Sequence, residues 1–264
     1  MCEKRAVAFL DILGFKHLLS TESTSTVASK YTKVIELIDE SNRLNLSTKH
    51  SPPSLFDHPL DSKGWCIMRI FSDSIILVSH ENTEESCLRL LVYVWRIMQG
   101  CLSAEMPFRG GISYDEMFVD ESKGIFLGRA LTKAYELEGS QDWIGVAIND
   151  ELEEHFPKIF KHDRGMFLDN IFLKYPVPFK GGGRKEMRTV NWRFNFIVEN
   201  GTRSLMPRSI DKAVITKVEN TLNYAKSVRD SGKVCFLDPD LIPPELMRFY
   251  CSKKEPPIEH GDDL

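Results

Sequence analysis

The chain has 264 residues, of which 42% are hydrophobic, so it can bury the core of one large domain. Its formal net charge is −4, and 34 basic residues are interspersed with 38 acidic ones, which argues against duplex DNA or RNA as the main partner. The six cysteines include no CxxC pair, and no apolar run approaches the roughly 20 residues needed to cross a bilayer. We expect a cytoplasmic protein with reduced thiols.

The first segment of the chain predicts a strand, a helix and a loop. Residues 5–12 (RAVAFLDI) predict a strand that is buried on both faces and ended by Gly14. Apolar residues at helical spacing over 27–38 predict an amphipathic helix that crosses back over a sheet. Residues 45–63 carry three prolines among polar residues, which predicts a long loop.

Two apolar runs then predict a β-hairpin. They cover residues 66–71 and 74–78, and only Ser72 and Asp73 separate them. Asp73 therefore lies at the tip, although the turn lacks the favoured Asn-Gly or Asp-Gly pair.

The next elements alternate between helix and strand. Thr83 followed by acidic residues predicts a helix start, and the helix continues to about Met98. Residues 108–113 (FRGGIS) predict a strand whose glycines permit close approach of another backbone or a ligand. After a turn at 120–123 we expect a helix over 128–138, and then a strand over 143–148.

This order predicts an α+β fold with a ferredoxin-like core, a mostly antiparallel sheet and helices on one face. Beyond Asn149 we expect strands at 171–177 and 190–198, and a long helix over about 209–230. We therefore divide the chain into a catalytic core, 1–150, and a C-terminal extension, 151–264, that completes or packs on the same domain.

Asp11 and Asp73 are the candidate chemical centre. In a ferredoxin-like sheet the first strand lies beside the hairpin, so the two carboxylates can converge at one edge. Two adjacent carboxylates repel each other unless a cation lies between them, and hard divalent ions that bridge carboxylate and phosphate oxygens would relieve this. The turn at Leu13 to Phe15 would also present backbone N–H groups to phosphate. The residues alone leave open that Asp11 caps a turn and that Asp73 is a solvated hairpin residue.

Three segments carry a family resemblance. Residues 9–15 (FLDILGF) resemble the first metal-binding motif of class III nucleotidyl cyclases, which is close to F-x-D-I-x-G-F. Residues 69–73 (RIFSD) resemble the second motif, with Ser72 in place of the usual Gly. FRGGIS resembles the following core strand, and 128–138 falls where the family has a G-x-x-V-N-x-A-x-R helix.

The resemblance covers roughly residues 7–148 and implies a site. It implies that two divalent metal ions, Mn²⁺ or Mg²⁺, are held by Asp11, Ile12 and Asp73. It implies a triphosphate near Leu13, Gly14, Phe15 and Lys16. The reaction implied is attack of the ribose 3′-hydroxyl on the α-phosphorus with pyrophosphate leaving, in a homodimer with two composite sites.

The chain departs from the family at the transition-state positions. Thr132 stands at the usual Asn and Glu136 at the usual Arg. Since a carboxylate cannot neutralise a developing phosphate charge, a cation must come from elsewhere. The candidates are Arg109, Arg129, Lys133, Lys174 and Lys180. Of these, Arg109 is taken as catalytic and Lys174 as substrate-binding. Thr132 is also taken as substrate-binding.

The base-reading positions also differ. Arg69 stands where purine enzymes have Lys, and Ile125 where they have Asp or Cys. An Arg can donate to a pyrimidine carbonyl, whereas Ile leaves a purine edge without its partner. FLDILGFK, SDS, RGGIS and AYELE together look like the pyrimidine cyclases of bacterial anti-phage (Pycsar) systems, which implies cyclic UMP or cyclic CMP as a signal for a separate effector. UTP is the first expectation and CTP the second.

Two other readings stay open. A non-catalytic nucleotide sensor on the same fold is favoured by Thr132 and Glu136. The second alternative function is a purine cyclase with altered base recognition.

Overall fold

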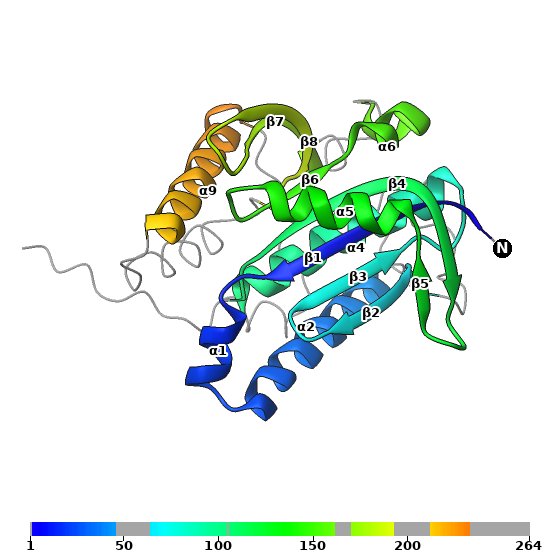
Figure 1. The fold of residues 1–264 in the computed structure, drawn as a ribbon, viewed down its shortest axis with the longest axis horizontal. Helices are drawn as coiled ribbons and strands as arrows, with labels where there is room; N and C mark the ends of the chain where they lie inside the picture. Colours follow the sequence, from blue (N-terminus) through cyan, green and yellow to red (C-terminus); the bar gives the residue numbers. More distant parts are fainter. Residues whose placement is uncertain (1, 46–63, 105, 162–169, 193–211, 233–264) are drawn as a thin grey trace, which may run out of the picture.

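The computed structural model describes residues 2–45, 64–104, 106–161, 170–192 and 212–232 (Figure 1). The strands are β1 (Glu3–Ile12), β2 (Ile67–Phe71), β3 (Ser74–Val78), β4 (Phe108–Asp120), β5 (Ile125–Leu127), β6 (Val146–Ile148), β7 (Phe172–Pro178) and β8 (Arg184–Val190). The helices are α1 (Phe15–Thr21), α2 (Thr24–Asn45), α4 (Glu84–Ser103), α5 (Arg129–Ser140), α6 (Asp150–His155), the 3₁₀ helix η1 (Pro157–Phe160) and α9 (Lys212–Asp230).

The described strands form one sheet in the order β2-β3-β1-β4-β6-β8-β7, with β5 paired to β4. Every pairing is antiparallel except that of β4 with β6. The order β2-β3-β1-β4 is that of a ferredoxin-like core, so the predicted α+β class and mostly antiparallel sheet are confirmed. β1 is central, with β3 on one side and β4 on the other.

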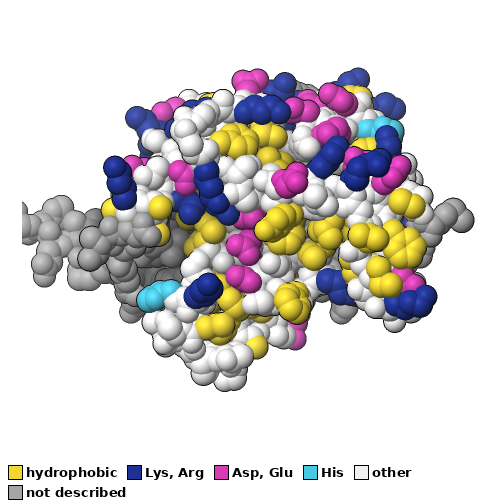
Figure 2. All heavy atoms as spheres, viewed as in Figure 1, with side chains coloured by type: hydrophobic (Ala, Val, Ile, Leu, Met, Phe, Trp, Pro, Cys, Tyr) yellow, Lys and Arg dark blue, Asp and Glu magenta, His cyan; other side chains and the backbone are white. Residues whose placement is uncertain are grey.

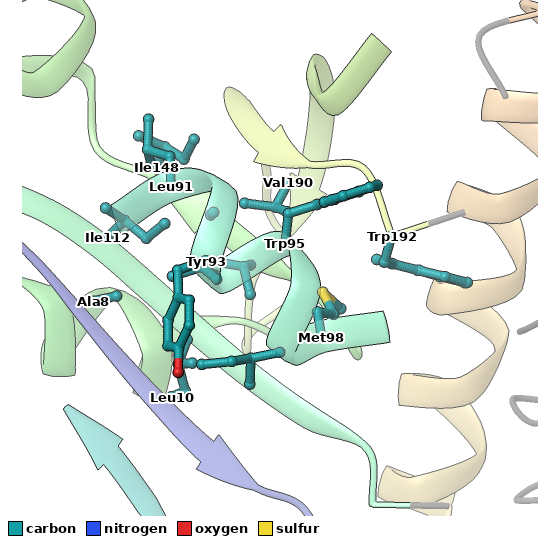
Figure 3. Packing of buried hydrophobic residues seen from close by; sticks show 14 of the residues in the cluster. Ala8, Leu10, Leu91, Tyr93, Trp95, Met98, Ile112, Ile148, Val190 and Trp192 are labelled. Atoms are coloured by element: carbon teal, nitrogen blue, oxygen red, sulfur yellow. The ribbon is translucent and has the colours of Figure 1, made fainter. Parts of the chain in front are cut away.

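Helices cover both faces of this sheet. Ala6, Ala8, Leu10 and Ile12 of β1 belong to the core that contains α4, and Figure 3 shows Ala8 and Leu10 beside that helix. The alternate residue Val7 packs in a second cluster with α5. In Figure 1, α5 accordingly lies on the viewer's side of the sheet, and α2 and α4 lie behind it. The expectation of helices on one face therefore holds for α2 and α4, but α5 takes the other face.

Two glycines let β4 pack closely on its neighbours. A Cβ added at Gly111 would lie 2.3 Å from the carbonyl oxygen of Ala134 in α5. One added at Gly110 would lie 2.4 Å from a methyl carbon of Leu10. The close backbone approach predicted from FRGGIS is confirmed, and it is what seats α5 on the sheet.

The hairpin and the cap of α4 match the predictions. β2 and β3 are joined by Ser72 and Asp73 alone. Thr83 caps α4, where its side chain accepts a hydrogen bond from the backbone N–H of Ser86 at 3.2 Å.

Other predicted bounds need correction. We expected a strand at 190–198, but the observed strand β8 lies earlier in the chain and ends at Val190. Residues 193–198 lie outside the described part of the chain. β8 was missed because its first half (RKE) is exposed and polar, so the apolar run after it gave the stronger pattern. α1 was missed as well, because its seven residues bury no side chain fully. Of the loop predicted over 45–63, residues 46–63 lie outside the described part of the chain. No described helix is long and apolar enough to cross a membrane.

Candidate active site

Asp11 and Asp73 lie at one end of two neighbouring strands. Asp11 pairs in register with Ser74 of β3, and Asp73 directly precedes Ser74. The backbone N–H of Ile12 donates to the carbonyl oxygen of Asp73 at 2.9 Å, and the Ser74 hydroxyl reaches Oδ1 of Asp11 at 3.5 Å. The structure therefore brings together the two carboxylates on which the sequence argument depends.

The turn that carries Asp73 has an unusual backbone. Ser72 has φ 57°, in the left-handed region that favours glycine. The Tyr31 hydroxyl, from α2, donates to the Ser72 carbonyl oxygen at 3.3 Å. The sequence predicts the turn but neither this conformation nor the contact with α2.

The surroundings of Asp11 disfavour its negative charge. The pKa of Asp11 is raised to about 6, first by burial and then by the nearby carboxylates of Glu138 and Asp73. The Arg109 guanidinium and the Ser74 hydrogen bond act in the opposite direction without cancelling the rise. A divalent cation beside Asp11 and Asp73 would supply the compensating charge.

The donor set suits a hard cation whose coordination is completed by substrate. Within the described residues, no group of three or more His, Cys, Asp or Glu side chains is arranged to hold a metal ion. Magnesium-like ions are commonly bound through one or two carboxylates together with substrate phosphates and water. Asp11 and Asp73 fit that mode, and they do not form an all-protein cage.

Arg109 is buried and already engaged. Its guanidinium pairs with Glu138 of α5 at 2.5 Å, and it also donates to the carbonyl oxygen of Gln141 at 2.8 Å. Arg109 lies opposite Asp11 in the β1–β4 register, on the face that α5 covers. This geometry argues against Arg109 as a cation that is free to meet phosphate.

Sequence reasoning missed Glu138. It is 4% exposed and follows Ala130 and Ala134 at four-residue spacing along the buried stripe of α5. A glutamate on a buried helical stripe requires a cationic or hydrogen-bonding partner, and this was the available signal.

Arg129 and Lys133 are held by acidic neighbours. Both pair with Asp115, at 3.2 Å and 2.8 Å, and Lys133 also pairs with Glu151 at 2.9 Å. The hydrogen bond from Lys133 is the first cause that holds the pKa of Asp115 below its usual range. These two cations therefore serve a surface network on β4 and α5.

Lys174 and Lys180 lie at the far side of the sheet. Lys174 is exposed on β7, the edge strand opposite β2, and pairs in register with Arg188. Lys180 is exposed in the turn between β7 and β8. The structure does not bring either residue to Asp11 within one chain.

The segment after β1 can meet phosphate only in part. The Leu13 N–H donates to the Pro107 carbonyl oxygen at 2.8 Å, so the expectation that it faces phosphate is wrong. Gly14 has φ 74° and precedes α1, in which Phe15 contacts Tyr31 edge-on and Lys16 is exposed. Lys16 is thus the exposed cation that follows Asp11 most closely along the chain.

Arg69, which the sequence predicts to read the base, lies on the same sheet face as Asp11. Its guanidinium reaches Glu121 at 3.3 Å and stands 5.2 Å from the centre of the Phe126 ring. Arg69 also lines a pocket of about 500 Å³ with Arg5, His80 and Glu121. Ile125 is 42% exposed on β5.

Hydrophobic side chains are exposed on this face. Figure 2 shows acidic side chains near the end of β1 with hydrophobic ones beside them over the β2–β3 hairpin and β5. We call the exposed residues Phe71, Ile125, Leu127 and Tyr135 the apolar patch; they are 81%, 42%, 66% and 58% exposed. Thr132 is also exposed on α5, one helical turn before Glu136. Patches of this kind mark interaction surfaces.

No family model matches the chain, and no curated protein matches it. Among solved structures, the chain is similar to the adenylyl cyclase CyaB from P. aeruginosa, with 12% identity and a TM-score of 0.46 over 72% of this chain and 94% of that one. It is also similar to the guanylate cyclase domain of RhGC from Catenaria anguillulae in complex with GTP, with 14% identity and a TM-score of 0.48 over 72% and 96%. A third similar structure is a bacterial light-regulated adenylyl cyclase, with 13% identity and a TM-score of 0.46 over 77% of this chain and 98% of that one. Sequence identities and TM-scores this low bear on the fold alone and assign no chemistry to this chain.

Proposed function

We propose that this protein is a nucleotidyl cyclase that converts UTP into 3′,5′-cyclic UMP and pyrophosphate, with CTP as the second choice of substrate. The observation that carries the proposal is the position of Asp11 and Asp73. They lie at adjacent ends of neighbouring strands, where burial and the carboxylates of Glu138 and Asp73 raise the pKa of Asp11. Two divalent ions, Mn²⁺ or Mg²⁺, bound there would activate the 3′-hydroxyl and neutralise the triphosphate.

In this reaction the ribose 3′-hydroxyl loses its proton to water and its oxygen forms a bond to the α-phosphorus. The bond from the α-phosphorus to the pyrophosphate oxygen breaks, and pyrophosphate leaves. The contributions of the chain are positional. Asp11 and Asp73 hold cations, while the Ser74 hydroxyl supports the Asp11 carboxylate. The hydrogen bond from Ile12 to Asp73 keeps the two strand ends in register.

We propose a homodimer because several cations that the sequence offers to the site are engaged elsewhere in the part of the chain that the structure describes. Arg109, Arg129 and Lys133 are engaged with Glu138, Asp115 and Glu151. The apolar patch lies on the side of the sheet that carries Asp11, so a second copy seated there would place its own cations near the triphosphate. The product, as a signal in anti-phage defence, would be read by a separate effector protein.

A panel of the four ribonucleoside triphosphates with Mn²⁺, analysed by mass spectrometry, tests the proposal. We expect cyclic UMP as the main product and its loss in Asp11→Asn and Asp73→Asn. Asp230→Asn, at the exposed end of α9, is the matched control and is expected to keep activity. Cyclic GMP or cyclic AMP as the main product would replace the pyrimidine assignment with that of a purine enzyme.

The buried ion pair of Arg109 favours one alternative, a nucleotide sensor without turnover. Thr132 and Glu136 are exposed on α5, and Arg109 is held by Glu138, so none of these three residues offers a free arginine to the transition state. Triphosphate binding by calorimetry without any cyclic product would select the sensor.

A further inference from the structure

One buried side chain outside the two motifs touches the turn that presents Asp73. The hydroxyl of Tyr31 donates to the main-chain carbonyl oxygen of Ser72 at 3.3 Å, across 41 residues of sequence. Tyr31 is 9% exposed, and its ring packs edge-on against Phe15 with 6.4 Å between ring centres. The contact therefore ties the hairpin tip to α2.

The turn needs support from outside the hairpin. Ser72 is the one non-glycine residue with positive φ in the part of the chain that the structure describes. Such a conformation costs about 1 kcal/mol or more and persists only where the surroundings enforce it. Tyr31 holds the Ser72 carbonyl, and the Ile12 N–H holds the Asp73 carbonyl at 2.9 Å, so both carbonyl groups of the turn are fixed by other elements.

We propose that Tyr31 is a positioning residue, whose hydroxyl fixes the Ser72–Asp73 turn so that the Asp73 carboxylate stays beside Asp11. In this proposal the hydroxyl acts through the turn, because the hydrogen bond that it donates goes to the carbonyl oxygen of Ser72. What Asp73 then does rests on the proposed function, whereas the fixing of the turn does not.

Hydrogen exchange of backbone amides tests the fixing of the turn directly. Tyr31→Phe keeps the ring and removes the donor. Tyr114→Phe is the matched control, since it removes another buried hydroxyl, one that donates to Asn82 at 2.5 Å. We expect the Ile12 amide, which donates to Asp73, to exchange about 3- to 10-fold faster in Tyr31→Phe and at the wild-type rate in Tyr114→Phe. Unchanged exchange in Tyr31→Phe would overturn the proposal, whatever the protein catalyses.

The metal dependence of cyclisation tests the consequence for the site. Tyr31→Phe is expected to raise the Mn²⁺ concentration for half-maximal rate about 3- to 10-fold, while KM for UTP at saturating Mn²⁺ changes less than about 2-fold. Adding Ser72→Gly, which takes positive φ without strain, should recover at least half of that loss.

The outcomes separate the two proposals. Faster exchange with an unchanged Mn²⁺ requirement would refute the positioning role, because a loosened turn would then leave the site intact. If the wild-type protein makes no cyclic product from any triphosphate, the proposed function fails, and the exchange measurement alone decides whether Tyr31 fixes the turn.

Discussion

Replacing Asp11 by Asn should make the metal-free protein more stable. The pKa of Asp11 rises from 3.8 to about 6, so the ionised carboxyl costs folding free energy. At about 1.4 kcal/mol per pKa unit the full cost is about 3 kcal/mol, and because Asp11 is partly exposed we expect solvent screening to reduce it to about 1 to 2 kcal/mol. Asparagine has nearly the same shape and no charge. In EDTA at pH 8, Asp11→Asn should therefore melt roughly 2 to 6 °C above wild type.

The pH dependence has a defined sign. A raised carboxyl pKa means that the folded protein retains a proton that the unfolded chain has lost, so wild-type stability falls as pH rises from about 4 to 6. Asparagine does not titrate, so the advantage of the variant should be full above pH 6 and nearly absent at pH 4. Calorimetry at several pH values measures this difference, with Asp230→Asn as the control that removes an exposed carboxylate.

Mn²⁺ should reverse the order of stability. At one hundred times its Kd, a ligand that binds the native state alone adds about 2.7 kcal/mol, which wild type should gain and Asp11→Asn should largely lose. If Asp11→Asn is less stable than wild type in EDTA at pH 8, the ionised Asp11 carboxylate does not destabilise the folded protein, and the reasoning is wrong. Equal stabilisation of both proteins by Mn²⁺ would show that the metal binds elsewhere.

Three further predictions concern the frame of the site. Gly111→Ala should cost about 1 to 3 kcal/mol in urea unfolding, because its Cβ would lie 2.3 Å from a carbonyl oxygen of α5. Gly139→Ala, in open space on the same helix, should instead gain about 0.5 to 1 kcal/mol. Arg109→Met should cost about 3 to 5 kcal/mol by leaving Glu138 buried and unpaired, and adding Glu138→Leu should restore most of that stability; a double variant as unstable as the single one would contradict this account. Phe71→Asp should shift a dimer toward monomer in sedimentation velocity, and an unchanged distribution would exclude the apolar patch as the interface.

The position of the two aspartates was predictable because it depends on local pattern. A two-residue connection between apolar runs forces a tight hairpin, and the antiparallel ladder then sets Asp11 opposite Ser74. Each inference needed only neighbours in the sequence and one rule about which strands lie together.

The cations were not predictable, because their partners come from elements far apart in the sequence. Arg109 meets Glu138 across 29 residues, since α5 lies on the face of β4 from which Arg109 projects. That face could not be chosen from periodicity, because the α5 stripe of Ala130 and Ala134 shows what is buried without showing on which side of the sheet. The positive φ angle of Ser72 could not be predicted for a similar reason, because it depends on contacts from α2 and β1.

The charges at the candidate site bear on the proposed homodimer. Asp11, Asp73 and Glu138 place three carboxylates near one strand end, and Arg109 compensates for one of them. Two divalent cations would balance the remaining two carboxylates and about half of the triphosphate charge, and the other half would still need a cationic partner. Lys16 can contribute from the same chain, whereas Lys174 lies on the opposite edge strand, away from Asp11 of its own chain. In the proposed homodimer, a cation of the second copy would supply the missing positive charge beside the apolar patch. A protein that is active as a strict monomer would have to draw this charge from its own chain, in which Lys16 is the exposed cation that follows Asp11 most closely.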